Sequence, residues 1–361
     1  MQVQRLSLRD WRSFAELELT FGEGLTALVG ANGQGKTNVL EAVGYLADLT
    51  SFRRATPEAL IRAGADHAIV RGEVRRGDRD ILIEAEIRPA GRSKVLVNRQ
   101  RLARRRDLLG AVQVTVFSPD DLELVKGGPR GRRDLLDNAL VGARPANDVP
   151  RAELDRVLRQ RNALLKQSRG RLSDEVVTTL EVWDTKLTEL GETWGSRRRD
   201  LVAQLAPYVA TAYGQLSGSA DAATLTYEPA WLGRLAAALE EAREDELRRG
   251  VSLVGPHRDE LDLSIGGLPA RSHGSQGEQR SLALALRLAV HLLLFDTYEE
   301  APVLLLDDVF SELDPQRSDA LVALLPAGQT LLTTAGALPE SVHPERVLAI
   351  ADGEVAPAEG R

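Results

Sequence analysis

Apolar and polar residues alternate at a period of two through the first quarter of the chain. Leu6 and Leu8 share one face of an extended segment, and residues 17–21 repeat the pattern. This alternation predicts two strands. Further strands are predicted at 25–29, 69–74, 80–87, 94–97 and 112–117. Turn signals at Arg76-Gly77-Asp78 and Ala90-Gly91 lie between the predicted strands.

The apolar residues change to a helical spacing between residues 134 and 249. Pro150 precedes the first clear helix of this region, and Gly170 is well placed to end it. Ser173 is the expected N-cap of a second helix that continues through Trp194. Because the turn between them is short, we expect the two helices to lie antiparallel. Their heptads are too few for a long coiled coil.

A pattern typical of parallel α/β structure returns from Val251 onward. Residues 281–295 are apolar nearly all round, which predicts a buried helix. Short strands buried on both faces are predicted at 303–306, 330–332 and 347–350. The predicted fold class is α/β, with a mixed-sheet nucleotide-binding head built from residues 1–120 and 251–361. A mainly helical domain, residues 121–250, is inserted between them.

Composition narrows the function classes. The 361 residues contain no cysteine, which excludes a disulfide framework, a cysteine nucleophile and a thiolate zinc site. The net charge of −7 restricts any nucleic-acid site to a local basic patch. No signal peptide is expected at the N-terminus, and the apolar run 282–295 contains Arg287 and His291 and is shorter than the ~20 residues of a membrane span. We therefore expect a cytoplasmic protein with no membrane partner.

The strongest chemical signal follows the predicted strand 25–29. It is a full match to the phosphate-loop pattern G-x4-G-K-[ST], in the required position between a strand and a helix. Its residues are Gly30, Ala31, Asn32, Gly33, Gln34, Gly35, Lys36 and Thr37. The glycines let backbone N–H groups approach phosphates, Lys36 would reach the β- and γ-phosphates of ATP, and Thr37 would bind Mg²⁺.

Two acids end the predicted strand 303–306. Parallel strands present their carboxyl ends at one edge, so Asp307 and Asp308 should lie beside the phosphate loop. Asp307 would help Thr37 hold Mg²⁺, and Asp308 would orient or deprotonate the attacking water. Lys36, Asp307 and Asp308 are therefore the predicted catalytic residues.

A third motif, Ser275-Gln276-Gly277-Glu278-Gln279, stands directly before the predicted buried helix. Ser275 and the free N–H groups of that helix form a second anion-binding end. One chain does not need two such ends for one γ-phosphate. We therefore expect Ser275 and Gly277 to close over ATP held by another copy; the alternative is a simple N-cap beside a flexible glycine.

The three motifs together resemble the ABC/SMC-type ATPase head, in which Ser311-Glu312-Leu313-Asp314 would be the D-loop. Within that class the chain is similar to the RecF family of bacterial recombination-repair proteins. The residues that carry this resemblance are 118–121 (SPDD), 128–133 (GPRGRR), Leu136-Asp137, 255–260 (GPHRDE) and 305–314 (LLDDVFSELD).

The resemblance implies ATP-dependent DNA binding at gaps and single-strand/double-strand junctions, dimerisation around ATP, and weak, DNA-stimulated hydrolysis that releases the clamp. The implied partners are a second copy of the chain and the mediators RecR and RecO, which support recombinase loading and SOS induction. Arg12 matches the place where such heads touch the nucleotide. A switch histidine is missing near Thr333, and Gln113 or the region 118–121 is a candidate for the Q-loop.

Four arginine-rich stretches suit DNA phosphates, although a run of arginines is more often a solvated or ion-paired face. They are 98–106, 126–133, 197–199 and 51–54. Three other functions compete with the RecF-like one. A transporter ATPase subunit would lack the large insertion between Lys36 and Ser275, a structural chromosome protein would need long helical arms, and a small-molecule kinase has no use for residues 275–279.

Overall fold

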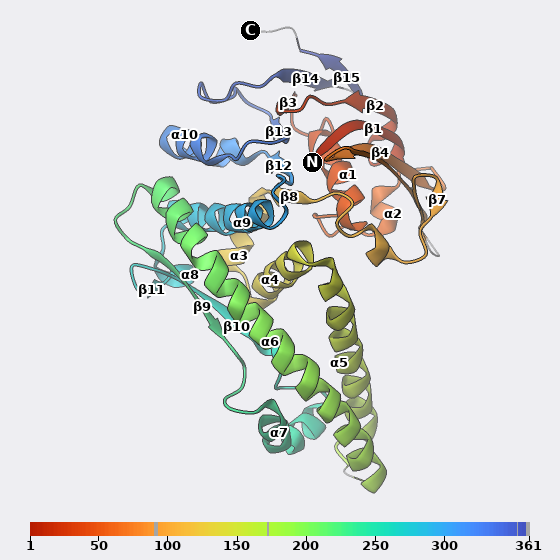
Figure 1. Cartoon of the computed structure of the whole chain (residues 1–361), viewed down its shortest axis with the longest axis vertical. Coiled ribbons are helices and arrows are strands. Elements are labelled where there is room, and N and C mark those ends of the chain that lie inside the picture. The colour runs from red at the N-terminus through yellow and green to blue at the C-terminus, as the bar shows by residue number, and fades with distance from the viewer. Residues whose placement is uncertain (90–92, 172, 352, 359–361) are drawn as a thin grey trace. The chain divides into compact units, whose positions relative to one another are not determined.

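The computed structural model describes residues 1–89, 93–171, 173–351 and 353–358, in two compact units. The nucleotide unit comprises residues 1–121, 212–218 and 280–361, and the insert unit comprises residues 122–211 and 219–279. Figure 1 shows how both ends of the chain, red and blue, contribute to the nucleotide unit.

One sheet of the nucleotide unit is mainly parallel, with the strand order β15-β14-β3-β13-β12-β8. Its strands are β3 (Leu25–Val29), β8 (Val114–Phe117), β12 (Val303–Asp307), β13 (Thr330–Thr334), β14 (Arg346–Ala351) and β15 (Glu354–Pro357). Only β15 runs antiparallel to its neighbour. Every residue of β12 and β13 is buried, as the continuous apolar runs predicted. The register pairs Asp307 with Thr333 at the carboxyl edge of this sheet.

The second sheet of this unit is antiparallel, with the order β2-β1-β4-β5-β6-β7. Its strands are β1 (Gln2–Trp11), β2 (Phe14–Thr20), β4 (Ala68–Arg76), β5 (Arg79–Ile87), β6 (Lys94–Val97) and β7 (Gln100–Arg101). The predicted strands therefore correspond to β1, β2, β4, β5 and β6, whereas β7 was not predicted and lies in the arginine-rich stretch 98–106. The turn predicted at Gly77 is present, with a positive φ of 53°. The turn predicted at Ala90-Gly91 lies outside the described residues.

A buried amide connects the two sheets. The side chain of Gln329, 1% exposed, directly precedes β13. Its Oε1 accepts from the backbone N–H of Val3 (2.7 Å), and its Nε2 donates to the carbonyls of Val3 and Gly22 (both 2.8 Å). The first strand and the last third of the chain thus share hydrogen bonds in addition to a continuous apolar core.

The nucleotide unit also contains α-helices and short 3₁₀ turns. They are α1 (Lys36–Asp48), α2 (Pro57–Leu60), η1 (Arg105–Leu108), η2 (Pro119–Leu122), η5 (Val309–Glu312), α10 (Pro315–Leu324) and most of α9 (Gln276–Tyr298). Within the described residues, α9 is the one helix long and apolar enough to cross a membrane. However, 67% of its most apolar window is buried inside the protein, as in a core helix.

The insert unit combines helices with a small antiparallel sheet, β11-β10-β9. Its helices are α3 (Glu123–Lys126), α4 (Pro129–Ala143), η3 (Pro145–Asn147), α5 (Asp148–Ser168), most of α6 (Asp174–Ser217), α7 (Leu235–Arg249), η4 (Pro256–Arg258) and α8 (Ala270–His273). Its strands are β9 (Ala223–Glu228), β10 (Glu260–Ile265) and β11 (Leu268–Pro269).

Two features of the insert unit differ from the sequence-based picture. Strand β9 lies inside a stretch expected to be helical, and it pairs with β10 over six residues. The insert unit accordingly includes residues 251–279, which the sequence pattern assigned to the head. The exact boundary between the functional domains stays a prediction. Helix α6 has 44 residues and continues through Pro207, so it is far longer than the run to Trp194 that its spacing indicated.

Candidate nucleotide site

The phosphate loop connects β3 to α1, as the motif predicted. Gly33 and Gly35 have positive φ angles of 85° and 101°, a conformation that side-chain-bearing residues rarely adopt. A Cβ at Gly35 would also lie 2.8 Å from Phe14 Cζ and from Ser13 Oγ. The loop therefore needs glycine here for its backbone shape and for its close contact with the β1–β2 turn.

Lys36 begins α1 and folds back over its own loop. Its Nζ donates to the carbonyls of Gly30 (2.8 Å) and Ala31 (2.9 Å). Burial lowers the pKa of Lys36, while the charges of Asp308 and Asp307 oppose that shift. A compact ammonium therefore stands at the loop within the field of both predicted acids.

Thr37 and Asp307 meet directly. Thr37 Oγ1 donates to Asp307 Oδ1 at 2.7 Å, and Thr333 Oγ1 donates to the same oxygen at 2.8 Å. Burial raises the pKa of Asp307, and these two hydrogen bonds act in the opposite direction. A hydroxyl and a carboxylate oxygen at this separation fit two adjacent positions around Mg²⁺, which prefers oxygen ligands in octahedral geometry.

Asp308 follows in a left-handed conformation with φ 50°. Its backbone N–H donates to Thr333 Oγ1 (2.9 Å). Its side-chain Oδ1 is buried and makes no hydrogen bond in the described part of the protein. A buried carboxylate oxygen without a donor is costly unless something else binds there. The left-handed turn therefore holds a hydrogen-bond acceptor near the phosphate loop, where a polarised water would satisfy it.

Arg12 is held firmly beside the loop. Its Nε and Nη2 form a bidentate pair with the carboxylate of Glu41 on α1 (2.8 and 2.7 Å), and its Nη1 donates to the Ala59 carbonyl (2.8 Å). Glu41 is fully buried and also accepts from Ser51 Oγ (2.5 Å). These contacts orient the guanidinium; a nucleotide contact of Arg12 stays a prediction.

Arg53 is a further candidate for the nucleotide site, although the sequence pattern assigned it to a DNA-binding cluster. Its charge is close enough to Asp307 to lower the pKa of that acid, and its Nη1 lies 3.5 Å from Asn38 Oδ1, just after Thr37. The exposed Arg53 therefore borders the nucleotide site. No sequence motif indicated this position, because it depends on how the segment after α1 folds back.

Ser275 caps α9. Its Oγ accepts from the Glu278 backbone N–H (3.3 Å), and Glu278 Oε2 accepts from the Ser275 backbone N–H (2.7 Å). This is a capping box, so the N-cap part of the alternative is confirmed within a single chain, while Gly277 lies inside α9. Ser275 itself is exposed. The N-cap role and a contact with a second copy are compatible, since the hydroxyl faces solvent at a helix N-terminus.

The suggestion of Gln113 for the Q-loop is wrong in this structure. The Gln113 carbonyl accepts from the N–H of Val303, at the start of β12. Gln113 therefore lies where the parallel strands begin, whereas Asp307 lies where they end. The region 118–121 lies at the correct edge, where Asp121 is buried and accepts from the Nε and Nη2 of Arg287 (2.9 and 2.7 Å).

Two of the four arginine stretches contain buried structural residues. Arg132 makes a bidentate pair with Glu260 (2.8 and 2.9 Å). Arg198, 3% exposed, pairs with both oxygens of Asp137 (2.8 and 2.9 Å) and with Asp259 (3.3 Å). These two arginines are therefore unsuitable for DNA, and that part of the hypothesis is wrong. The motifs 128–133, 136–137 and 255–260 instead meet in one buried ion-pair network of the insert unit.

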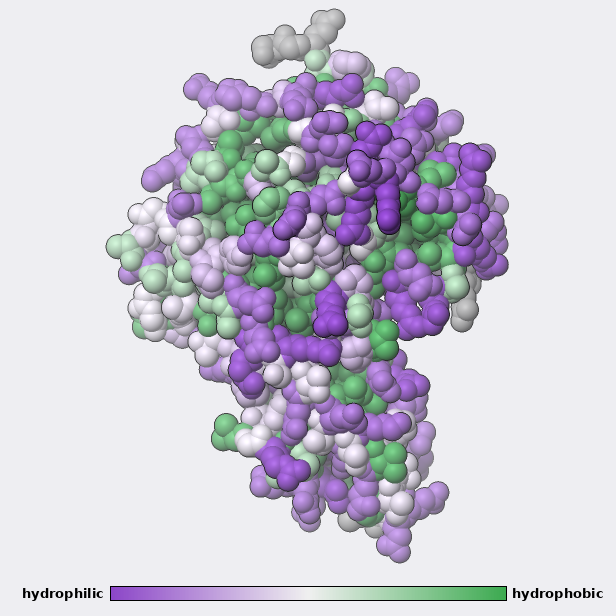
Figure 2. All heavy atoms as spheres, viewed as in Figure 1, coloured by the Kyte–Doolittle hydropathy of each residue, from purple (hydrophilic) through white to green (hydrophobic). Residues whose placement is uncertain are grey.

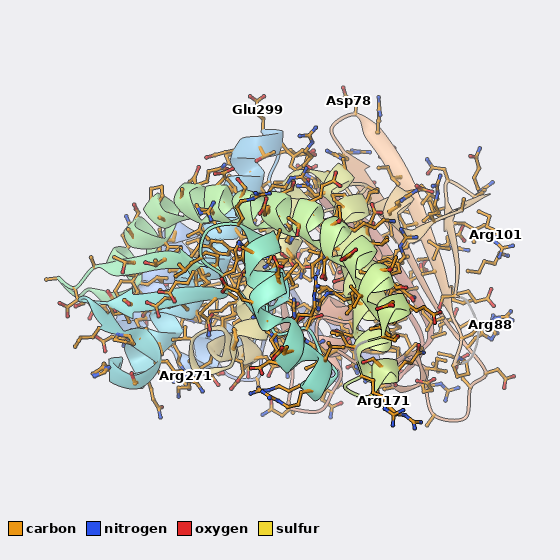
Figure 3. The ribbon with its side chains drawn as sticks, turned by 90° about the horizontal axis from the view of Figure 1, so that it is seen from below. Asp78, Arg88, Arg101, Arg171, Arg271 and Glu299 are labelled. Carbon is orange, nitrogen blue, oxygen red and sulfur yellow. The ribbon has the colours of Figure 1, made fainter. Side chains whose placement is uncertain are left out.

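The stretch 98–106 forms an exposed basic hairpin, which includes β7 and η1. Asn98 and Arg99 turn the chain with φ angles of 49° and 66°. Arg101 projects away from the ribbon in Figure 3, and Figure 2 shows hydrophilic side chains over the edge where Figure 1 labels β7. Among the ion pairs of the described residues, none involves Arg99 or Arg101. This stretch remains available to phosphates.

The chain is similar to known proteins over most of its length. The family described as RecF/RecN/SMC N terminal domain matches residues 2–334. The chain is 45% identical to the DNA replication and repair protein RecF of Streptomyces avermitilis and 46% identical to that of Frankia alni, each over 93% of both chains. The solved structure of the recombination mediator protein RecF-ATP in the RecFOR pathway superposes with a TM-score of 0.91 at 29% identity, covering 99% of this chain and 97% of that one. The Smc head of Pyrococcus furiosus (TM-score 0.60, 19% identity, 99% of this chain and 95% of that one) shares the fold.

Proposed function

The chain belongs to the RecF family of DNA replication and repair proteins, and from this premise we propose that it acts in the RecFOR pathway as a homodimeric, ATP-gated clamp on gapped DNA. RecR and RecO would be its protein partners, and the cytoplasm its location. The relatives and the RecF-ATP structure support ATP binding and a repair role. The alternative of a transporter subunit is not favoured.

The single observation that carries the proposal is the meeting of Thr37 with Asp307 at the phosphate loop, 2.7 Å apart. Residues 30–37 would hold the triphosphate, and Thr37 with Asp307 would hold Mg²⁺. The metal would neutralise charge that develops on the transferred phosphoryl group. Lys36 would leave the Gly30 and Ala31 carbonyls to bind phosphate oxygens.

Asp308 would orient the attacking water. Its unsatisfied Oδ1 is the acceptor that such a water needs, and it lies at the carboxyl edge with Asp307. Aspartate has a shorter arm than the glutamate more usual in the wider class, so slow turnover is expected, which suits a switch. DNA stimulation of that turnover belongs to the same proposal.

Dimerisation would complete each site. The exposed Ser275 carries a hydroxyl at the N-terminus of α9, the half-buried Gly277 lies in the first turn, and a γ-phosphate bound by a second copy would supply the matching anion. The basic hairpin 98–106 is the proposed DNA surface. Its arginines carry no base-reading pattern, so binding should be independent of sequence and should weaken steeply with salt.

Light scattering with and without ATP, followed by binding to gapped DNA, tests the proposal. We expect a monomer without nucleotide, a dimer with ATP, and DNA binding that depends on ATP. The Arg99→Gln/Arg101→Gln variant should retain the dimer and lose DNA affinity. The matched variant Arg156→Gln/Arg248→Gln, on exposed helix faces of the insert unit, should retain both. A protein that stays monomeric in ATP would refute the clamp.

A further inference from the structure

Asn32 of the phosphate loop differs from every other asparagine of the chain. The sequence has six asparagines, and only Asn32 is followed by glycine. Within the described residues no hydrogen bond engages the Asn32 amide, whereas the side chain of each of the other five takes part in one at 2.7–3.0 Å. Those five are Asn38, Asn98, Asn138, Asn147 and Asn162.

Asn32 and Gly33 form an exposed turn of the loop. The φ angle of Gly33 is 85°, and a Cβ built on it would meet no atom within 4 Å. Across the part of the chain that the structure describes, the Gly33 N–H donates to no protein acceptor. The side-chain amide of Asn32 and the backbone nitrogen that follows it are therefore accessible, and no protein contact keeps them apart.

We propose that Asn32 is a site of spontaneous deamidation and that a bound nucleotide protects it. The Gly33 nitrogen attacks Cγ of Asn32, the Cγ–Nδ2 bond breaks, and the side-chain nitrogen leaves as ammonia with the proton of the Gly33 N–H. Water then opens the cyclic imide at one of its two carbonyls, which leaves aspartate or isoaspartate. Glycine favours the reaction because it has no Cβ to obstruct the attack.

Either product adds a carboxylate to a loop that must hold phosphates. Lys36 Nζ bonds to the carbonyls of Gly30 and Ala31 at 2.8 and 2.9 Å, and Ala31 shares a peptide bond with Asn32. A carboxylate at position 32 would compete with ATP for that ammonium and would repel the triphosphate. Isoaspartate would also lengthen the main chain and change the spacing of the loop N–H groups. The modified loop should therefore bind ATP much more weakly.

The protection rests on the proposed function, in which residues 30–37 hold the triphosphate. The backbone N–H groups of a phosphate loop point at the bound anion. A Gly33 N–H that donates to a phosphate oxygen is not available to lose its proton and attack Asn32, and the bound phosphates hold the loop in one conformation. An empty loop should therefore be modified much faster than an occupied one.

The experiment incubates the purified protein at mildly alkaline pH, either without nucleotide or with Mg²⁺ and the non-hydrolysable analogue AMP-PNP. Trypsin releases Asn32 in the peptide 13–36 and Asn98 in the peptide 95–99. Mass spectrometry measures the conversion of each asparagine, and an isoaspartate methyltransferase labels the isoaspartate. Asn98 is the internal control, because it is exposed but its Oδ1 accepts from the Leu82 N–H (2.9 Å) and arginine follows it.

We expect Asn32 to convert in the empty protein while Asn98 stays intact. ATP binding, measured by isothermal titration, should fall in proportion to the converted fraction, because the modified loop should bind on the order of 100-fold more weakly. With AMP-PNP at roughly ten times its Kd, about a tenth of the loops are empty, so conversion should slow about tenfold. Asn32→Gln, whose longer side chain cyclises far less readily, should keep its own starting affinity throughout the incubation.

Equal conversion of Asn32 and Asn98 in the empty protein would overturn the proposed site. Conversion at the same rate with and without AMP-PNP, in protein that binds the analogue, would overturn the protection. Full ATP affinity in a converted sample would overturn the effect on the loop. Fresh protein that bound neither nucleotide would refute the proposed function and with it the protection, while conversion in the empty protein tests the site separately.

Discussion

Thr333 bonds to Asp307 through its side chain, with Thr333 Oγ1 donating to Asp307 Oδ1 at 2.8 Å. The same hydroxyl accepts from the backbone N–H of Asp308 (2.9 Å). One threonine on β13 therefore orients the predicted metal ligand and fixes the turn that carries the predicted water-binding acid. The parallel register that pairs Thr333 with Asp307 explains why it can do both.

Replacing Lys36 with Met should abolish tight ATP binding. The ammonium is the one charged group of the loop that can reach phosphate oxygens, and loss of a charge-assisted contact of this kind lowers affinity on the order of 100-fold. Isothermal titration with ATP measures the change. Lys186→Met, on an exposed face of α6, is the control and should bind normally. Retained tight binding by Lys36→Met would contradict the phosphate-loop assignment.

Asp308→Asn should bind ATP normally and hydrolyse it on the order of 100-fold more slowly, because an amide accepts a proton poorly. ATP-bound dimer should therefore accumulate, visible by light scattering under turnover conditions. Asp296→Asn, on the last turn of α9, serves as the control. Normal turnover by Asp308→Asn would remove Asp308 from catalysis.

Ser275→Arg should leave ATP binding to the single chain intact and prevent ATP-driven dimerisation. A long cationic side chain would fill the space meant for the γ-phosphate of the second copy. Thr178→Arg, on an exposed part of α6, should dimerise like the unmodified protein. If Ser275→Arg formed dimers as readily as that control, the shared site would not exist in the proposed form.

Arg198→Met should destabilise the insert unit by about 3–5 kcal/mol, because Asp137 and Asp259 would remain buried without their cation. Burial raises the pKa of Asp259, and Arg198 opposes that shift, so its removal would also favour protonation of this acid. Urea denaturation followed by circular dichroism measures the loss. Arg197→Met, which removes a half-buried contact with Asn147 (3.0 Å), should cost much less; equal losses would show that the network contributes little.

The stability of the folded chain should fall as the pH drops from about 6.5 to about 4. Burial lowers the pKa of His257 and of His291 to about 4, from the usual 6.5. Above pH 6.5 the two histidines are uncharged in the folded and in the unfolded chain, so neither changes the free energy of unfolding there. Below it the unfolded chain takes up protons first, which costs the folded state up to roughly 3 kcal/mol for each histidine.

A denaturation series across this pH range, with His291→Leu for comparison, measures the effect. The variant should show a shallower loss of stability between pH 6.5 and pH 4. Parallel curves for the two proteins would mean that His291 accepts a proton in the folded state as easily as in the unfolded one.

Much of the nucleotide unit was predictable because its signals are local. Period-two alternation located β1 and β2, a short apolar run located β3, and the phosphate-loop pattern placed Lys36 and Thr37 at the start of α1. The meeting of Thr37 with Asp307 was also expected, since parallel strands share a carboxyl edge. The roles of these residues in catalysis remain predictions.

The remainder depends on contacts between distant segments. Strand β9 follows a long helix and pairs with residues more than thirty positions later, so its own six residues carried little information. The sequence pattern treated Arg132 and Arg198 as surface cations, because nothing local distinguishes an arginine that faces solvent from one that faces Glu260 or Asp137. Arg53 was similarly invisible as a neighbour of Asp307.

The position of β3 in its sheet has a consequence for biosynthesis. β3 lies between β13 and β14, which the ribosome makes about three hundred residues after it. Until those strands have been translated, the strand that leads into the phosphate loop has no hydrogen-bonding neighbour on either side. A nascent chain released before residue 330 would therefore lack the nucleotide pocket entirely, and its unpaired strand would invite aggregation or a chaperone.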